Sequence, residues 1–560
     1  MTVRVPVKKS HYNVIVVGAG SAGCVLAARL SSDPKCRVLL IEAGGKPRRW
    51  FDFGVPTRMP SAFYLPMGQA AYDWCFQSEP EPQLNRRRIS CPRGRTLGGS
   101  SSINGMVYVR GHALDFERWE ALGAKGWSYA DVLPYFRRAE AAGDAERDEA
   151  YCGRAGPLVS NAGSLQNPLH EAFLSAAHEA GYLRSGDLNG FQQEGFGTLP
   201  MTVDQGERCS TYEAYLKPAL KRENLTVLSK AFVKRLIFDK QSCTGVELGL
   251  NSNLVRIAAD KTIVASGAIG SPHLLLCSGI GPADHLRSMS IAVNADAPDV
   301  GSNLRDHLEV YVQQKCSQPV SLNSRLGMAG KGLIGARWLL RRDGLGATNH
   351  FETGGFIRHS AEATWPNIQF HFLPAAMSYA GDLATRGHGF QVHVGPMSSE
   401  STGTLRLQSP DISVAPELKF NYMSKDEDWE VFRAAIRSAR TIFAQPALAE
   451  FSNGEISPGV DADSDSALDA FVRAHAESAY HPCGTCRMGS DESAVVDPQG
   501  RVNGVDNLWV ADASVFPHLT NGNLNAPTIM LAEKISDHLL GARLPAQSEP
   551  WYGQGQTLKR

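Results

Sequence analysis

The sequence predicts an α/β fold that opens with a Rossmann-like strand–helix–strand unit, and three features of residues 12–45 support this prediction. A continuous apolar run at Val14–Val17 is typical of a strand buried on both faces. Glycines with the spacing Gly-x-Gly-x-x-Gly follow at the start of a helical segment, at Gly18, Gly20 and Gly23. Glu42 ends a second apolar run about 20 residues later, where a carboxylate can accept hydrogen bonds from a ribose diol. The unit therefore predicts an adenine dinucleotide site, although the motif alone does not distinguish NAD from FAD.

The composition is that of a large globular protein without an excess of charge. The chain has 560 residues, of which 43% are hydrophobic, so it can bury a large core and form about two to four structural units. The formal net charge is -1 and the sequence pI is near 7.0. Because no overall field favours nucleic acid or an anionic membrane, we expect no nucleic-acid partner.

Targeting and cysteine patterns restrict the location. Residues 1–10 contain neither the apolar core of a signal peptide nor the pattern of a transit peptide, and no apolar segment of about 18 residues occurs in the sequence. We therefore expect a cytoplasmic protein, whose contact with the cytoplasmic face of a membrane would be peripheral. The eleven cysteines do not resemble a disulfide framework, and the pair Cys483 and Cys486 lacks two clear further zinc ligands, so we predict no metal.

A second glycine-rich segment, residues 94–102, combines glycines and serines ahead of the apolar run 106–109. Small residues at this density allow the backbone to lie against a flat or charged ligand and to expose its amides. The alternative is a flexible linker, which Ile103, Asn104 and the following apolar run disfavour.

Here the chain resembles the glucose-methanol-choline (GMC) oxidoreductases, a family of FAD enzymes that oxidise alcohols. Residues 94–104 are similar to the first family signature and residues 267–281 to the second, and the resemblance extends from Tyr12 to about Leu544. It implies a Rossmann-like FAD-binding domain combined with a discontinuous α+β substrate domain, which is built on an antiparallel or mixed sheet.

The resemblance and the periodicity together predict the domain limits. The FAD-binding domain is expected to comprise residues 1–160, 200–308 and 465–545, the substrate domain 161–199 and 309–464, and a loosely held polar tail 546–560. Antiparallel strands are expected at 225–228, 231–238 and 244–248, and strands of the substrate sheet at 309–314, 354–358, 367–373, 389–395 and 403–408. Helices are expected at 165–180, 211–221, 426–443 and 466–476, the last with Ser466 as its cap.

The resemblance implies the residues that contact FAD. They are Gly18, Gly20, Ser21, Ala22, Gly23, Glu42, Ala43, Trp74, Gly98, Gly99, Ser100, Asn104, Gly105, Met106, Val107, Val233, Ser266, Gly267, Asp512, Ala513, Asn523 and Pro527. Some family members attach FAD through a histidine where this chain has Ile103, so we expect the FAD to be held without a covalent bond.

Two C-terminal segments, 479–489 and 520–537, are similar to those that supply the family's catalytic pair, which maps to His481 and Asn523. Counting back from the terminal helix favours Asn523 over Asn521 or Asn525. A neutral imidazole can accept the proton of an alcohol, and an amide can orient the hydroxyl and donate to the charge that develops on its oxygen. The alternative for His481, a core histidine without a chemical role, is disfavoured by the motif.

Within the family, the chain most resembles the bacterial choline dehydrogenases. Glu309 occupies the place of a carboxylate that faces the trimethylammonium group in choline-oxidising relatives, His371 matches a second histidine of that pocket, and Tyr480 lies in a pocket segment. A carboxylate with aromatic faces suits a quaternary ammonium, which has no hydrogen-bond donor. A structural ion pair is the alternative for Glu309.

These observations predict the oxidation of a primary alcohol to its aldehyde by hydride transfer to flavin N5, with choline and betaine aldehyde as substrate and product. The same chemistry on a neutral aliphatic alcohol, or on a small hydroxy acid such as 3-hydroxypropionate, is the alternative. A nicotinamide-dependent dehydrogenase and a non-enzymatic flavoprotein are alternatives of other classes. We expect a quinone or the respiratory chain as the electron acceptor, and the sequence leaves a homodimer open.

Overall fold

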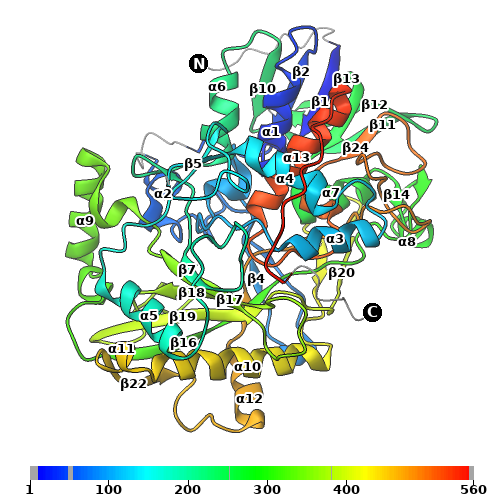
Figure 1. Ribbon diagram of the computed structural model, residues 1–560. Coiled ribbons are helices and arrows are strands. Elements are labelled where there is room, and N and C mark those ends of the chain that lie inside the picture. The colour runs from blue at the N-terminus through cyan, green and yellow to red at the C-terminus, as the bar shows by residue number, and fades with distance from the viewer. Residues whose placement is uncertain (1–10, 48–53, 145, 251–252, 380, 554–560) are drawn as a thin grey trace.

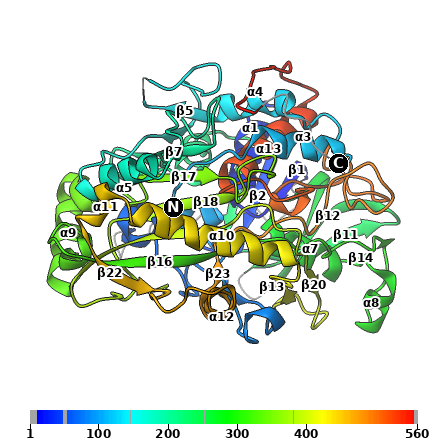
Figure 2. The ribbon, with the colours of Figure 1, turned by 60° about the horizontal axis from the view of Figure 1, so that its bottom comes forward.

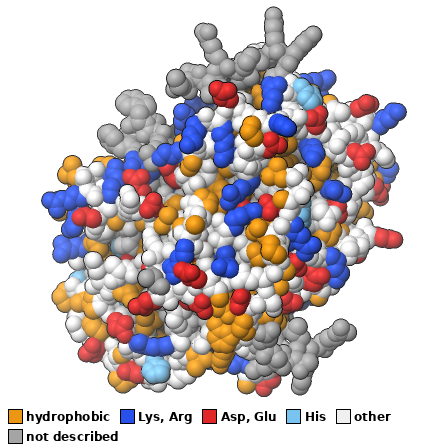
Figure 3. Space-filling model, turned by 45° about the horizontal axis from the view of Figure 1, so that its top comes forward, with side chains coloured by type: hydrophobic (Ala, Val, Ile, Leu, Met, Phe, Trp, Pro, Cys, Tyr) orange, Lys and Arg blue, Asp and Glu red, His pale blue; other side chains and the backbone are white. Residues whose placement is uncertain are grey.

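The computed structural model describes residues 11–47, 54–144, 146–250, 253–379 and 381–553, which contain two seven-stranded sheets (Figure 1). Residues 1–10, in which we looked for a targeting signal, lie outside the described part. Within the described ranges, no helix is both long enough and apolar enough to cross a membrane. On the face shown in Figure 3, basic and acidic side chains are interspersed, as the near-zero net charge leads one to expect.

The first sheet contains the predicted dinucleotide-binding unit. Its parallel part has the order β10 (Leu225–Ser229), β2 (Val38–Glu42), β1 (Tyr12–Val17), β13 (Asn253–Val264) and β24 (Leu508–Val510). The first half of β13 pairs instead in antiparallel fashion with β12 (Ser242–Leu250), which pairs with β11 (Phe232–Asp239). One long strand therefore joins a parallel and an antiparallel region.

The expected antiparallel pairing of residues 225–228 was wrong, because β10 runs parallel to β2. The side chain of Asn224 donates to the carbonyls of Ser31, Asp33 and Cys36, and its own carbonyl accepts from Val38 N at 2.8 Å. These bonds hold the beginnings of both strands at the same end of the sheet, which makes them parallel.

The second sheet is antiparallel throughout. Its order is β22 (Ser452–Ser457), β16 (Leu308–Cys316), β19 (His388–Pro396), β18 (Ile368–Leu373), β17 (Thr353–Ile357) and β7 (Gly195–Thr198), with β23 (Glu477–Ser478) also paired to β16. The expected strand at 403–408 does not belong to it, because β20 (Thr404–Arg406) pairs with β21 (Glu417–Lys419) in a separate hairpin. The domain limits given above remain a proposal. Strand β23 joins this sheet, although residue 477 was expected in the FAD-binding domain.

Alternation along the central strands gives this sheet one apolar and one polar face. On the apolar face, Phe390 packs edge-on against Phe443 of α10 (Asp426–Phe443), with 5.4 Å between the ring centroids, and α10 runs along the sheet in Figures 1 and 2. The alternate positions on the other face are polar, at Glu309, Tyr311 and Gln313 of β16, Gln369 and His371 of β18, and Gln391 and His393 of β19. The site therefore takes its side chains from a face that the core does not use.

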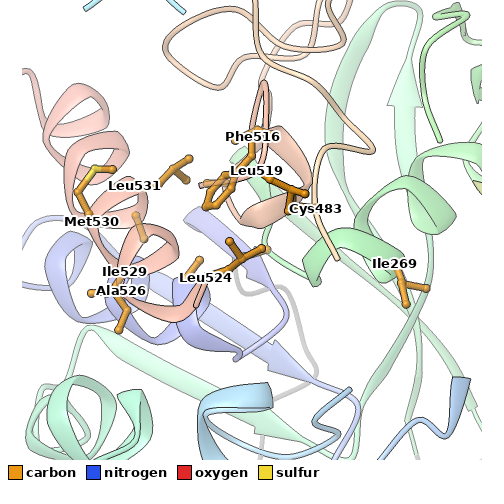
Figure 4. Packing of buried hydrophobic residues seen from close by; sticks show 14 of the residues in the cluster. Ile269, Cys483, Phe516, Leu519, Leu524, Ala526, Ile529, Met530 and Leu531 are labelled. Carbon is orange, nitrogen blue, oxygen red and sulfur yellow. The ribbon is translucent and has the colours of Figure 1, made fainter. Parts of the chain in front are cut away.

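Helix α1 (Ser21–Leu30) packs against the last helix, α13 (Asn525–Leu540). Figure 4 shows the apolar packing at the start of α13, where Leu531 points toward Phe516 and Leu519, while Ala526, Ile529 and Met530 lie on the other side of the helix. The other helices are α2 (Val55–Arg58), α3 (Ala113–Ala121), α4 (Tyr129–Ala139), α5 (Pro168–Glu179), α6 (Lys217–Ala219), α7 (Gly267–Cys277), α8 (Ala283–Ser288), α9 (Met328–Arg341), α11 (Pro446–Ala449) and α12 (Asp465–His475). Short strands pair as β3 (Phe76–Gln77) with β4 (Ser90–Cys91), β5 (Glu140–Ala142) with β6 (Leu158–Ser160), β8 (Val203–Asp204) with β9 (Glu207–Arg208) and β14 (Ile280–Gly281) with β15 (Ala295–Asp296).

Three local expectations need correction. Helix α12 is capped by Ser464, whose Oγ accepts from Ala467 N, and not by Ser466. Residues 211–221 form a π-helical turn followed by α6 rather than one regular helix. The described part of the tail is also held firmly, because Gln547 N donates to Ala130 O at 2.9 Å and Trp551 packs on Tyr129.

A buried carboxylate joins α13 to its neighbours. Glu533 accepts two hydrogen bonds from Arg29 of α1, one from Tyr215 and an ion pair from Arg138 of α4, each at 2.8 Å, and its side chain is fully buried. Glu533→Ala would leave two arginines partly buried without their carboxylate. We expect it to lower the free energy of unfolding by about 3–5 kcal/mol in denaturant titrations followed by tryptophan fluorescence. The control is Glu171→Ala, which removes an exposed pair with Arg184 and should cost less than about 1 kcal/mol.

Candidate active site

A cavity between the two sheets collects most of the predicted site residues. Its lining includes the predicted catalytic pair, His481 and Asn523, and all three predicted substrate residues, Glu309, His371 and Tyr480. It also includes most of the predicted cofactor residues, which are Gly18, Gly20, Ser21, Ala22, Glu42, Ala43, Trp74, Gly99, Ser100, Asn104, Gly105, Met106, Val107, Val233, Ser266, Gly267, Asp512 and Ala513. Gly23, Gly98 and Pro527 do not line it. Residues that are up to about 500 positions apart in the chain thus share one site.

The two glycine-rich loops press against each other at one end of the cavity. A Cβ added to Gly99 would lie 2.6 Å from the Cα of Gly20, and one added to Gly23 would lie 1.8 Å from the carbonyl oxygen of Gly18. Gly23 therefore allows α1 to pack closely on the loop and does not itself reach the cavity. Gly98 has the same kind of structural role, because it has φ of +90° and donates to Ala19 O at 2.7 Å.

The N-terminus of α1 opens into this end of the cavity. Its cap residue Gly20 provides no side-chain hydrogen bond, and the first turn contains no acidic residue. Unsatisfied backbone N–H groups and the positive end of the helix dipole make such a terminus a site for phosphate. The helix start is therefore suited to a pyrophosphate.

Glu42 lies at the end of β2 beside this loop. Its carboxylate accepts from Ala19 N at 2.9 Å and from Gly44 N at 2.7 Å, and burial raises its pKa to about 7. Because both backbone bonds hold the carboxylate at the cavity wall, it can accept further hydrogen bonds from a ribose diol.

The N-terminus of α13 opens into the same cavity from the other side. Its cap, Leu524, has no side-chain hydrogen bond, and Asn525 and Thr528 line the cavity. Pro527 is buried in the helix packing and does not line the cavity, so its assignment as a cofactor contact stays a prediction. Ser21 Oγ donates to Asn525 Oδ1 at 2.8 Å, so the two helix starts are directly joined.

The predicted catalytic pair is in hydrogen-bond contact, and a second histidine stands behind it. Asn523 Nδ2 lies 3.2 Å from His481 Nε2, and His481 Nδ1 lies 3.1 Å from Nδ1 of His307. His307 Nε2 lies 3.0 Å from the carbonyl oxygen of Met397, which can only accept. The proton of neutral His307 is therefore on Nε2, so its Nδ1 accepts a hydrogen bond from His481 Nδ1–H. His481 Nε2 is then unprotonated and accepts from Asn523 Nδ2.

The protonation states support this assignment. Burial lowers the pKa of His307 to about 4, so it is neutral near pH 7. Burial also lowers the pKa of His481 well below its usual value, and the nearby His307, His371 and Arg93 lower it further. Both imidazoles are therefore neutral, and His481 can act as a hydrogen-bond acceptor at Nε2.

Asp306 fixes the backbone that carries His481. Its Oδ1 accepts from His481 N at 2.7 Å, and its Oδ2 accepts from Ser478 Oγ and from Tyr422 Oη at 2.6 Å. Tyr480, directly before the base, has φ of +66°, which is strained for a residue with a side chain. The buried carboxylate thus holds a turn that the local sequence would not favour.

Asn523 is oriented by two donors from the polar face of the second sheet. Its Oδ1 accepts from Gln369 Nε2 at 3.2 Å and from His371 Nε2 at 3.4 Å, so its Nδ2 points to His481. The sequence analysis missed His307 and Gln369. The signals were present, because His307 follows Asp306 in the chain and Gln369 lies two residues before His371 on β18.

The predicted substrate residues lie together at the second sheet. Glu309 Oε1 is 3.2 Å from Nδ1 of His393, which also lines the cavity and which the sequence analysis missed. Tyr311 stacks on His393 with 3.8 Å between ring centroids, and Phe351 meets His393 edge-on at 5.1 Å. This end of the cavity combines a carboxylate with aromatic surfaces.

Comparisons with known proteins agree with this arrangement. The GMC oxidoreductase family matches residues 12–309 and 399–532. The chain is 52% identical over 542 residues to an oxygen-dependent choline dehydrogenase of Rhizobium etli, covering 96% of this chain and 97% of the relative. It is 51% identical over 557 residues to a protein of the same name from Photobacterium profundum, covering 98% and 97%.

Solved structures with the same fold include pyridoxine 4-oxidase from Mesorbium loti, with a TM-score of 0.86 and 30% identity over 95% of this chain and 100% of that one. A variant of Aspergillus oryzae formate oxidase, solved to study FAD modification, has a TM-score of 0.88 and 25% identity over 95% and 98%. The two family segments cover most of the chain, and the relatives match it over nearly its whole length. The chain therefore belongs to the GMC oxidoreductase family.

Proposed function

We propose that the protein oxidises choline to betaine aldehyde with non-covalently bound FAD as the hydride acceptor. The observation that carries this proposal is the unprotonated Nε2 of His481, which faces a cavity shared with the carboxylate of Glu309. The names of the relatives in Rhizobium etli and Photobacterium profundum favour the same substrate.

The residues of the cavity fit FAD. The uncapped start of α1 suits the pyrophosphate, Glu42 suits the ribose, and the uncapped start of α13 suits an electron-rich ring edge. Ile103 lines the cavity and has no nucleophilic atom, which supports non-covalent binding. When bound, FAD supplies a two-electron acceptor for the hydride of the alcohol carbon.

The protein side of the reaction follows from the tautomer. His481 Nε2 accepts the hydroxyl proton as the hydride leaves the carbon, and Asn523 Nδ2 donates to the oxygen that becomes negative. His481 Nδ1–H donates a hydrogen bond to His307 Nδ1 throughout, so the imidazolium that forms on His481 stays oriented. The hydrogen bonds from Gln369 and His371, both neutral side chains, hold Asn523 in place and add no charge to the site.

Replacing the base should separate catalysis from cofactor binding. His481→Ala removes the proton acceptor, and we expect kcat to fall by about 10²- to 10⁴-fold while flavin absorbance near 450 nm is retained. Stopped-flow measurement of anaerobic flavin bleaching by choline provides the check. His178→Ala, an exposed histidine on α5, is the control and should bleach at the normal rate. A normal rate in His481→Ala would place the base elsewhere, and a purified protein without flavin would favour a nicotinamide enzyme.

Replacing the carboxylate should identify the substrate class. Glu309→Gln removes the negative charge with little change in shape, and we expect the KM for choline to rise about 10- to 100-fold, which corresponds to about 1.4–2.7 kcal/mol. A neutral primary alcohol and 3-hydroxypropionate are measured alongside. If the flavin of the wild-type protein is bleached by the neutral alcohol or by 3-hydroxypropionate but not by choline, the choline assignment fails. The assignments of the base and of the cofactor then still stand.

We also propose that helix α9 makes peripheral contact with an anionic membrane and that a membrane quinone accepts the electrons. Met328, Leu333 and Leu340 are 94%, 72% and 85% exposed. They lie within about 140° of the helix circumference. Residues 325–342 contain five basic and no acidic residues, and two of the five, Arg337 and Arg342, form ion pairs with Asp343 and Glu207. The helix lies at the edge of the molecule in Figures 1 and 2.

The position of α9 supports this role. Lys331 lies over the ring of Tyr64, whose neighbour Phe63 lines the cavity. A lipid surface at α9 would therefore bring a lipophilic acceptor close to the cavity. The named relatives are called oxygen-dependent. Turnover should therefore be measured under two conditions, with a soluble quinone under nitrogen and with oxygen as the only acceptor, and the two rates compared.

Vesicle flotation tests the membrane proposal. The protein is expected to float with vesicles of phosphatidylcholine and phosphatidylglycerol at low salt and to detach as salt screens the basic residues. Leu333→Asp with Leu340→Asp should abolish flotation. Leu254→Asp, at a site 68% exposed on β13, is the matched control and should float normally. If the wild type, the double variant and Leu254→Asp float equally, α9 does not bind the membrane.

A further inference from the structure

The carboxylate of Glu309 belongs to a chain of hydrogen bonds that begins at backbone groups. Gln391 Oε1 accepts from Met377 N at 2.7 Å and from Gln313 Nε2 at 2.8 Å, and Gln313 Nε2 also donates to Met377 O at 2.8 Å. A backbone N–H can only donate and a carbonyl can only accept, so both side-chain amides have fixed orientations. The Nε2 group of Gln391 must therefore face away from Met377, toward His393.

This amide decides which nitrogen of His393 carries a proton. Gln391 Nε2 lies 2.8 Å from His393 Nε2. Since the amide group donates, His393 Nε2 must be the acceptor, and the single proton of the ring is on Nδ1. His393 Nδ1 then donates to Glu309 Oε1 at 3.2 Å. His393 thus meets Glu309 as a neutral donor, through a hydrogen bond that is not charge-assisted on the imidazole side.

Aromatic stacking holds the ring of His393 in this plane. Tyr311 lies between Tyr379 and His393, with centroid distances of 3.9 Å and 3.8 Å. Burial raises the pKa of Tyr311 and of Tyr379 well above the usual value, so both phenols stay neutral. The stack therefore fixes geometry and adds no charge beside Glu309.

Other charged groups near Glu309 have partners of their own. Glu477 lies opposite Glu309 where β23 pairs with β16, and Arg87 forms an ion pair with it. Arg93 directs Nη2 to the carbonyl oxygen of Tyr480 at 2.7 Å. The hydrogen bond from His393 is thus the contact that decides whether the Glu309 charge is available to a ligand.

We propose that Gln391 and His393 are positioning residues that keep the Glu309 charge free and thereby set the preference for a quaternary ammonium alcohol over a neutral one. This proposal rests on the function proposed above. An imidazolium at position 393 would form a charge-assisted hydrogen bond to Glu309. A trimethylammonium group has no donor with which to compete for that carboxylate, so a neutral His393 is a condition for binding it.

The measured quantity is the ratio of kcat/KM for choline to kcat/KM for 3,3-dimethyl-1-butanol, in which carbon replaces the ammonium nitrogen. Gln391→Glu keeps the acceptor for Met377 N and Gln313 Nε2 but presents a carboxylate oxygen to His393 Nε2, which favours a proton on both ring nitrogens. We expect the ratio to fall at least tenfold, through the KM for choline. Flavin absorbance and melting temperature verify the fold.

Two variants of His393 separate its hydrogen bond from its bulk. His393→Leu removes the hydrogen bond that holds the Glu309 carboxylate in place. The charge stays free, but the carboxylate is no longer fixed in the cavity, so the ratio should also fall about tenfold. His393→Asn places an amide N–H near the position of Nδ1 and stays neutral at every pH, so it should restore most of the ratio. An unchanged ratio in both Gln391→Glu and His393→Leu would overturn the proposal.

The wild-type holoenzyme gives an independent test. Histidine-selective ¹⁵N NMR, with the His393 signal assigned by its loss in His393→Asn, should show a neutral ring protonated at Nδ1, and an imidazolium spectrum would overturn the proposal. Glu309→Gln serves as the reference. If Glu309→Gln leaves the KM for choline unchanged, the choline function fails; if it raises this KM while the other variants leave the ratio unchanged, only the role of Gln391 and His393 fails.

Discussion

A buried imidazole can accept a proton from a substrate only if its lone pair faces the cavity, and here the carbonyl of Met397 imposes that condition. The carbonyl requires a proton on Nε2 of His307, so Nδ1 of His307 requires a proton on Nδ1 of His481. Burial keeps both rings neutral, because a charged imidazole would be desolvated at high cost. Asn523, which Gln369 and His371 orient, directs its amide N–H to this unprotonated Nε2.

The same arrangement occurs again at the substrate end of the cavity. There the backbone of Met377 orients the amide of Gln391, and the amide sets the tautomer of His393. A backbone N–H or carbonyl cannot change its hydrogen-bonding role with pH, whereas a carboxylate or imidazole in its place could. Two anchors of this kind define the protonation states of the site without placing additional charges in it.

The sequence predicted well those features that depend on local pattern. The glycine spacing, Glu42, His481 and Asn523 could be assigned because a motif of fixed length carries each of them, and helix α10 followed from its apolar stripe. The parallel direction of β10 could not be assigned, because it depends on bonds from Asn224 to a distant turn. His393 was missed for a similar reason: its pairing opposite Tyr311 and His371 is a matter of strand register, which the sequence does not specify locally.

The distribution of charge explains why the chemistry occurs in the middle of the cavity. Two uncapped helix starts supply partial positive charge at the dinucleotide end, and Glu309 supplies a negative charge at the substrate end. Between them stand neutral groups, His481, Asn523, His371 and Gln369. This distribution suits a phosphate-bearing cofactor at one end and, in the proposed function, a cationic alcohol at the other. In the proposed reaction, the groups that meet the hydroxyl are those whose hydrogen bonds can strengthen as charge develops, because these groups carry no fixed charge.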